Sequence, residues 1–273
     1  MTDPRTGTPP DGDWLGTPYL CFERRGPIAV VTVDRPEARN AMTQSMYYGI
    51  RYAIEHVNRS DDLAGLLLTG SGDVFIPGGD LGGPSDDAWG EAPGLMGLDS
   101  LPFETLRRSS KPVVSAVNGL CQGGGMLIAM LSDVAVAAES ATFRSPELFR
   151  GIADTIYGQV LPRQIGPARA RDMLLTGRVV DATTAVDWGI VARLATDEHV
   201  VEVATDALEW ACRTAPGARA DVKRVVDAYY GSYDRMTMEQ SLSGPEPIEG
   251  FHAFKERRSP GWIPDDLHTD GRI

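Results

Sequence analysis

The sequence has no long apolar run. No stretch of about 18 uncharged apolar residues occurs, so nothing in it has the composition of a membrane-spanning helix. Residues 1–16 are rich in Pro, Gly and Asp and contain no apolar core of the signal-peptide kind. We therefore expect a cytoplasmic protein without membrane contact, in which residues 1–18 form a flexible leader.

Cysteine and positive charge are also scarce. The three cysteines, Cys21, Cys121 and Cys212, lack the paired spacing of a disulfide framework or a metal site, so we expect them to be small core residues. The 4 histidines have no metal-ligand partner at helical spacing, so no metal is expected. The chain has 26 Lys and Arg against 38 Asp and Glu, a net charge of -12. This charge repels a phosphate backbone, so no nucleic acid is expected as a partner, and an anionic ligand would need a local basic patch.

The nucleotide-binding signatures are missing as well. Two glycine turns are present, at residues 77–80 and 119–125. No Gly-Lys-Ser/Thr follows either turn, and neither has an acidic residue at the distance of a dinucleotide fingerprint. Nucleotide hydrolysis and hydride transfer are therefore disfavoured.

The patterns that are present predict one large domain, or a domain with a small appendage. At 273 residues, with 42% hydrophobic residues, the chain can bury a full core and enclose a pocket. β-prone runs flank Arg25-Gly26 and predict a hairpin, and apolar residues at helical spacing follow Thr43. Further apolar runs predict buried strands and one buried helix, at residues 66–68, 74–76, 112–117, 126–131 and 134–138. Helical patterns dominate beyond about residue 168, so we expect an α/β fold with a helical C-terminal region.

The two glycine turns are candidates for an anion site. Where a strand enters a helix through glycines, backbone N–H groups lack partners and the helix dipole adds positive potential. Two such turns could converge on one oxygen and stabilise the negative charge that develops there. The same glycines could serve only tight turns or close packing, and composition alone favours that second interpretation.

Four segments of the sequence resemble the crotonase superfamily, the enoyl-CoA hydratase/isomerase family. They appear in the family's order and spacing, as DRPEARNAM at residues 34–42, FIPGGDL at 75–81, NGLCQGGG at 118–125 and SPE at 145–147. The resemblance extends from about residue 19 to residue 262. It implies a spiral of ββα units at residues 19–195 and a helical region at residues 196–273 that packs against neighbouring subunits, in a trimer or a dimer of trimers. It also implies an acyl-CoA thioester as the substrate, with no separate cofactor.

The resemblance also implies which residues bind this thioester. The N–H groups of Gly79 and Gly124 look like the family's two donors to the thioester oxygen. The positions that match CoA contacts in the family are Arg39, Ala41, Pro77, Asp80, Leu81, Phe254 and Arg257. The two arginines suit phosphates because the guanidinium fork donates two hydrogen bonds, although both could be solvated surface residues. Pro77 departs from the small residue usual there and removes one backbone N–H near the adenine end.

The acid and base residues depart from those of the family's hydratases, which hold a water between two glutamates. Leu127 stands at the first position and cannot accept a proton, whereas Glu147 is retained at the second. This arrangement resembles mitochondrial-type Δ3,Δ2-enoyl-CoA isomerases and predicts that Glu147 shifts the double bond of an enoyl-CoA. Capping preferences offer another explanation, with Ser145 as the N-cap, Pro146 at the first helical position and Glu147 in the first turn.

Asp154 is a second candidate acid. Dienoyl-CoA isomerases carry an aspartate after a similar segment, although the segment here is one residue shorter and those enzymes also have an acid where Leu127 stands. Asp154 could equally be a helix N-cap before residues 155–161. The alternatives are hydration or dienoyl-CoA isomerisation with Asp154 as second acid, hydrolysis or carbon–carbon cleavage, and acyl-CoA binding without catalysis. Residues 81–101, rich in Gly, Pro, Asp and Leu, are expected to select the acyl chain.

Overall fold

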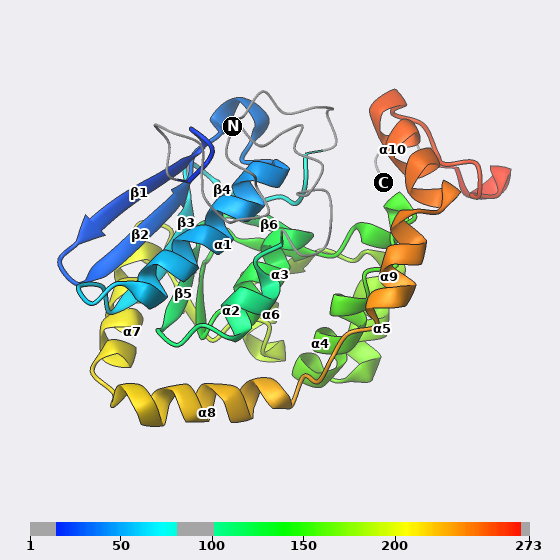
Figure 1. The fold of residues 1–273 in the computed structure, drawn as a ribbon. Helices are drawn as coiled ribbons and strands as arrows, with labels where there is room; N and C mark the ends of the chain where they lie inside the picture. Colours follow the sequence, from blue (N-terminus) through cyan, green and yellow to red (C-terminus); the bar gives the residue numbers. More distant parts are fainter. Residues whose placement is uncertain (1–14, 81–100, 269–273) are drawn as a thin grey trace.

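Two β-sheets form the centre of the computed structural model, which describes residues 15–80 and 101–268 (Figure 1). The larger sheet has six strands in the order β1-β2-β3-β5-β7-β10, and the smaller has four in the order β4-β6-β8-β9. The strands are β1 (Leu20–Arg25), β2 (Ile28–Val33), β3 (Gly65–Gly70), β4 (Val74–Ile76), β5 (Val113–Val117), β6 (Leu120–Gln122), β7 (Val134–Ala138), β8 (Thr142–Arg144), β9 (Val180–Asp181) and β10 (Arg193–Ala195). The predicted α/β architecture is confirmed.

The chain passes repeatedly from the larger sheet to the smaller one. β1 and β2 form the predicted antiparallel hairpin, whereas β2, β3, β5 and β7 run parallel. After β3, β5 and β7 the chain enters β4, β6 and β8 in turn, and these three strands also run parallel. Because parallel strands end at the same edge of a sheet, the segments that follow β4, β6 and β8 lie side by side.

Three strands of the smaller sheet were not predicted from the sequence. β6, β8 and β9 have two or three residues each, which is too short for an alternating pattern to be visible. β6 lies inside residues 119–125, which we had interpreted as one glycine turn. These strands are held by partners far away in the chain.

Helices cover the sheets and make up most of the C-terminal part. They are α1 (Gln44–Arg59), α2 (Phe103–Arg107), α3 (Gly124–Leu131), α4 (Thr155–Ile165), α5 (Pro167–Thr176), α6 (Ala182–Trp188), α7 (Val200–Cys212), α8 (Pro216–Ala228), α9 (Arg235–Leu242) and α10 (Pro245–Glu256), with 3₁₀ turns η2 (Pro36–Ala38), η5 (Glu147–Arg150) and η6 (Asp265–Leu267). α1 begins where predicted because the hydroxyl of Thr43 accepts a hydrogen bond from the N–H of Met46. α3 packs against strands of both sheets and is almost entirely buried, as its uniformly apolar sequence requires.

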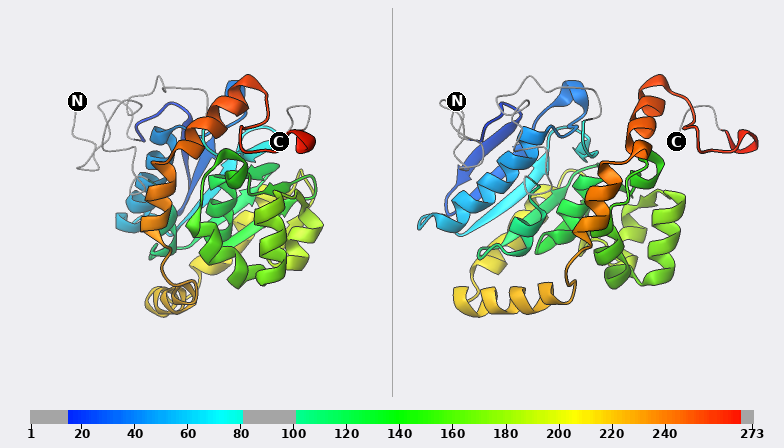
Figure 2. Two further views of the ribbon diagram at one scale, coloured as in Figure 1. Left: turned by 90° about the vertical axis from the view of Figure 1, so that its right-hand side faces the viewer. Right: turned by 45° about the vertical axis from the view of Figure 1, so that its right-hand side comes forward.

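The last four helices run from the larger sheet along one end of the molecule and back to η5. α7 packs on β3, β5 and β7 of the larger sheet. α8 then lies along one end of the molecule with none of its residues buried, and α9 and α10 return past α4 to η5 (Figures 1 and 2). α10 therefore reaches η5 from a distant part of the sequence.

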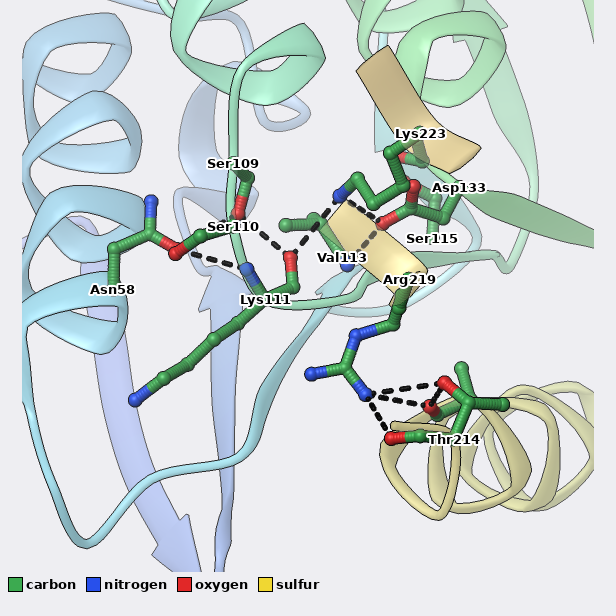
Figure 3. Close-up of polar contacts among 12 residues, drawn as sticks. Asn58, Ser109, Ser110, Lys111, Val113, Ser115, Asp133, Thr214, Arg219 and Lys223 are labelled. Atoms are coloured by element: carbon green, nitrogen blue, oxygen red, sulfur yellow. Dashed lines mark hydrogen bonds and ion pairs between the residues drawn. The ribbon is translucent and has the colours of Figure 1, made fainter. Parts of the chain in front are cut away.

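Polar contacts attach α8 to the core (Figure 3). The ammonium of Lys223 donates to Asp133 at 2.7 Å and to the carbonyl of Lys111 at 3.2 Å. Its side chain is 11% exposed, so this ion pair is partly shielded from solvent. The loop that carries Lys111 is itself tied to α1, because Asn58 accepts hydrogen bonds from each of residues 109–111. One chain of polar contacts thus links α1, the loop before β5, and α8.

One of the three cysteines is not the core residue that we expected. Cys121 is buried and Cys212 is half-buried, but Cys21 is exposed because it lies on β1 at the edge of the larger sheet. The expectation of a core residue was wrong there. In the two described segments, no helix combines the length and the apolarity needed to cross a bilayer.

Replacing Lys223 by alanine should loosen α8, because the change leaves the partly buried Asp133 without its ammonium partner. We expect the amides of α8 to exchange with deuterated solvent roughly tenfold faster, measured by mass spectrometry. Arg224→Ala is the matched control, since this neighbouring side chain is 74% exposed and pairs with Asp221 on the same helix. Equal exchange in the two variants would show that Lys223 does not anchor the helix.

Candidate active site

The two glycine turns lie against each other. Gly78 follows β4, and Gly123 lies between β6 and α3. A Cβ built on Gly123 would lie 3.3 Å from the Cα of Gly78 and 2.9 Å from Oε1 of Glu147. The φ angles of Gly78 and Gly123 are 107° and 54°, values that favour glycine. The parallel pairing of β4 with β6 therefore brings the two turns together, and the parallel pairing of β6 with β8 brings Glu147 beside them.

Each turn presents one unpaired backbone N–H group. Met42 donates to the carbonyl of Gly78 at 2.9 Å and accepts from the N–H of Asp80 at 2.8 Å, so the N–H of Gly79 between them is not used. Gly124 is the first residue of α3, and its N–H has no partner within the helix. In the part of the chain that the structure describes, neither N–H has a hydrogen-bond acceptor. The helix dipole adds positive potential at Gly124, so the two groups suit an anionic oxygen.

Two buried tyrosines support the second turn. Tyr157 donates a hydrogen bond of 2.5 Å to the carbonyl of Gly123. The hydroxyl of Tyr47 fills the space that a Cβ on Gly124 would need. Burial raises the pKa of both tyrosines, so both remain neutral. The packing thus requires glycine at position 124. The hydrogen bond from Tyr157 occupies the carbonyl of Gly123.

Glu147 stands beside the turns at the start of η5. Its Oε2 accepts a hydrogen bond of 2.6 Å from the hydroxyl of Ser145, and its Oε1 lies against Gly123. Burial raises the pKa of Glu147 to about 8, and the negative charge of Asp154 contributes to this rise. The capping explanation was wrong in one respect, because Pro146 is the N-cap and the hydroxyl of Ser145 binds the Glu147 carboxyl instead. Glu147 is therefore largely protonated at neutral pH and close to its titration point.

Asp154 is the N-cap of α4, as one of our two interpretations predicted. Its Oδ1 accepts hydrogen bonds from the N–H groups of Ile156 at 2.9 Å and Tyr157 at 3.1 Å. Burial raises the pKa of Asp154 to about 6, against the effect of these two hydrogen bonds. Asp154 is not among the residues that line the pocket beside Glu147. It acts on Glu147 through its charge.

A pocket of about 530 Å³ opens at the two turns. Four residues predicted to contact CoA line it, namely Ala41, Pro77, Asp80 and Phe254. The carboxylate of Asp80 is fixed by an ion pair of 2.7 Å with Arg35. A larger hollow of about 760 Å³ lies between α2 and α8, but neither glycine turn lines it. The chemistry of the glycine turns and Glu147 therefore belongs to the smaller pocket.

Two further predicted CoA contacts, Arg39 and Arg257, lie outside this pocket. Arg39 is exposed at the end of η2, and Arg257 is exposed at the end of α10. Neither lines the pocket, so their contact with CoA stays a prediction. Leu81, like most of the segment 81–101 expected to select the acyl chain, lies outside the described residues.

Three basic residues of the pocket were not predicted from the sequence. They are Arg144 on β8, Arg150 in η5 and Lys255 on α10. The two arginines flank the Ser-Pro-Glu motif, which was the available signal, but their direction depends on the strand register. They supply within the pocket the local basic patch that the net charge of -12 made necessary.

The position of Leu127 holds no second acid. Leu127 is 0% exposed and belongs to the apolar interior of α3. Within the two described segments, no cluster of three or more His, Cys, Asp or Glu could hold a metal ion. The arrangement can hold an oxygen at two N–H groups as it becomes negative, while one carboxyl moves a proton at a neighbouring atom.

Known proteins share this arrangement of segments. The family model for enoyl-CoA hydratase/isomerase matches residues 23–264. A carnitinyl-CoA dehydratase of Citrobacter koseri is 32% identical over 267 residues, covering 89% of this chain and 97% of that protein. The structure of an enoyl-CoA hydratase/isomerase from Pseudoalteromonas atlantica has a TM-score of 0.77 at 27% identity, covering 90% of this chain and 100% of that one. A monofunctional enoyl-CoA isomerase from M. smegmatis has a TM-score of 0.67 at 28% identity, covering 82% and 99%. The chain is therefore an enzyme of crotonase fold that belongs to the enoyl-CoA hydratase/isomerase family.

Proposed function

We propose that the protein shifts the double bond of an enoyl-CoA thioester through an enolate, with Glu147 as the group that moves the proton. The observation that supports this most directly is that Glu147 lies against the two turns with unpaired N–H groups, while a buried leucine occupies the position of a second acid. Leu127 can neither accept a proton nor orient a water molecule. A proton removed from one carbon would therefore return to another carbon, and water would not add.

The mechanism follows from the geometry of the pocket. The thioester oxygen binds between the N–H groups of Gly79 and Gly124, which stabilise its charge as the enolate forms. Glu147 removes a proton from the carbon next to the double bond and returns it at the far end of the conjugated system. A pKa of about 8 suits both steps, because the carboxyl can gain and lose a proton near neutral pH. The substrate carries the CoA, and the reaction needs no further cofactor.

The Glu147→Gln change should lower the conversion of a 3-enoyl-CoA into a 2-enoyl-CoA by roughly a hundredfold or more, because the amide cannot carry the proton. The measurement is product formation and deuterium uptake in heavy water, followed by mass spectrometry with esters of several chain lengths. The wild-type protein should exchange deuterium with little hydration.

Glu139→Gln serves as the control, since Glu139 is an exposed carboxylate just beyond β7. The melting temperature of the Glu147→Gln variant should not fall, because the buried site disfavours the ionised carboxylate. Undiminished turnover in this variant would refute the role of Glu147.

The pH dependence should follow the ionisation of Glu147. As a base it must be ionised, so kcat/KM for isomerisation should rise with pH and level off above about 8. Asp154→Asn removes a neighbouring negative charge, which lowers the pKa of Glu147 and moves this rise to lower pH. Asparagine keeps the N-cap of α4, so the fold should be retained. A rate that falls at every pH while the midpoint of the profile stays in place would contradict a purely electrostatic role.

A second candidate is hydration, or dienoyl-CoA isomerisation, with Asp154 as the second acid. The raised pKa of Asp154, about 6, and its effect on Glu147 favour it. The two backbone N–H groups that hold its Oδ1 oppose it. Hydration of a 2-enoyl-CoA by the wild-type protein, abolished in Asp154→Asn, would establish this candidate over the first.

We also infer that the protein assembles as a trimer or a dimer of trimers, through a surface that includes α8. Val222, Val225 and Val226 on α8 and Tyr229 at its C-cap recur at helical spacing and are 58% to 65% exposed. Such an apolar stripe on a helix without buried residues is typical of an interface.

Val226→Glu should reduce the mass measured by light scattering after gel filtration, whereas Val179→Glu, at another exposed valine, should not. An unchanged mass would place the interface elsewhere.

A further inference from the structure

The peptide that joins Gly123 to Gly124 has a donor at each end. Because the peptide is trans, its carbonyl points away from the N–H of Gly124 that is open to the pocket. That carbonyl accepts hydrogen bonds from the N–H groups of Met126 at 3.0 Å and Leu127 at 3.2 Å, in the first turn of α3. It also accepts a hydrogen bond of 2.5 Å from the phenol of Tyr157. The helix alone therefore supplies two donors for the two lone pairs of this oxygen, and the phenol adds a third.

The fold fixes Tyr157 at its backbone and at its hydroxyl. Its N–H donates at 3.1 Å to Oδ1 of Asp154, the N-cap of α4, so the first turn of this helix is held. Its side chain is 0% exposed and is among the largest that are fully buried. A buried phenol needs an acceptor, and the carbonyl of Gly123 provides it. The contact between α4 and the second glycine turn is therefore well defined.

The phenol of Tyr157 remains a hydrogen-bond donor while its acidic neighbours titrate. Burial raises the pKa of Tyr157 well above its usual value, and the negative charges of Glu147 and Asp154 raise it further. Ionisation of either carboxyl therefore strengthens the hold of the phenol on its proton.

The two N–H groups of the site differ in what binds the far side of their peptides. The peptide before Gly79 has the carbonyl of Gly78, which accepts from the N–H of Met42 at 2.9 Å. The peptide before Gly124 is bound by two amides and a phenol. A donor on a peptide oxygen draws electron density from the nitrogen through amide resonance, and this strengthens the N–H as a donor. The effect is larger in a buried site of low dielectric constant.

We propose that Tyr157 is a positioning residue of the reaction, which polarises the peptide before Gly124 so that its N–H donates a stronger hydrogen bond to the thioester oxygen. Tyr157 does not line the pocket, so it acts through the peptide and not on the substrate. The gain is greatest when the oxygen becomes negative in the enolate. This inference rests on the proposed function only in placing the thioester oxygen at the N–H groups of Gly79 and Gly124.

The carbonyl stretch of a bound thioester measures this hydrogen bond without turnover. We use saturated acyl-CoA esters of several chain lengths, labelled with a heavy isotope at the thioester carbonyl, and record difference infrared spectra of their complexes with the full chain. Binding to the wild-type protein should lower the stretching frequency. In Tyr157→Phe the lowering should be about a fifth smaller, as expected for the loss of one cooperative hydrogen bond.

A fluorotyrosine at position 157 should change the frequency in the opposite direction. Fluorine makes the phenol a stronger donor and leaves the ring nearly unchanged in size, so the frequency should fall below that of the wild-type complex. Both replacements keep the two amide donors on the carbonyl of Gly123, so the turn should be retained. In isomerisation, Tyr157→Phe should lower kcat about threefold with KM almost unchanged, because the weakened N–H matters most for the charged oxygen.

Tyr230→Phe is the matched control, because it removes the same hydroxyl from a half-buried tyrosine that does not line the pocket. It should keep the frequency and kcat of the wild-type protein. Equal frequencies in the wild-type and Tyr157→Phe complexes would overturn the proposal, as would a fluorotyrosine that raises the frequency. A protein without isomerase activity whose bound thioester still responds to Tyr157 would refute only the proposed reaction.

Discussion

The contact between the two glycine turns is the constraint on which the site depends. Gly78 and Gly123 meet without side chains between them and adopt positive φ angles, so the neighbouring N–H groups of Gly79 and Gly124 can face one pocket. Parallel pairing of β4 with β6 fixes this contact by aligning the ends of the two strands. The hydroxyl of Tyr47, on α1, closes the space behind Gly124. Among residues 15–80 and 101–268, no hydrogen-bond acceptor is paired with either donor, so both are open to a ligand oxygen.

Burial then decides which groups around these donors carry charge. Glu147 is kept largely neutral near pH 7 by its surroundings and by Asp154, whereas Arg144 and Arg150 remain cations. The pocket is therefore positive although the whole chain carries a net charge of -12. Such a local reversal of charge favours an anionic ligand and an oxyanion intermediate in the same cavity.

The C-terminal helices complete the pocket from outside the spiral core. α10 contributes Phe254 and Lys255 to the lining and packs on η5, which carries Glu147 and Arg150. It reaches this place by way of α8, which is attached through the ion pair of Lys223 with Asp133. A helix from the C-terminal part of the chain therefore shapes the site through its packing on η5.

The sequence by itself determined the α/β class, the first hairpin, the start of α1 and the bounds of β4 and β7, because local periodicity and capping specify these elements. Its four motifs identified the family and the enzyme class, and the comparisons confirm both. The catalytic role of Glu147 and the CoA contacts of Arg39 and Arg257 stay predictions. The structure confirmed the N-cap at Asp154, which was one of the two interpretations that the sequence left open. Only the tertiary structure showed the short strands β6, β8 and β9 and the arrival of Arg144 at the pocket. These features depend on pairing between distant strands and on burial, and neither leaves a periodic trace in the sequence.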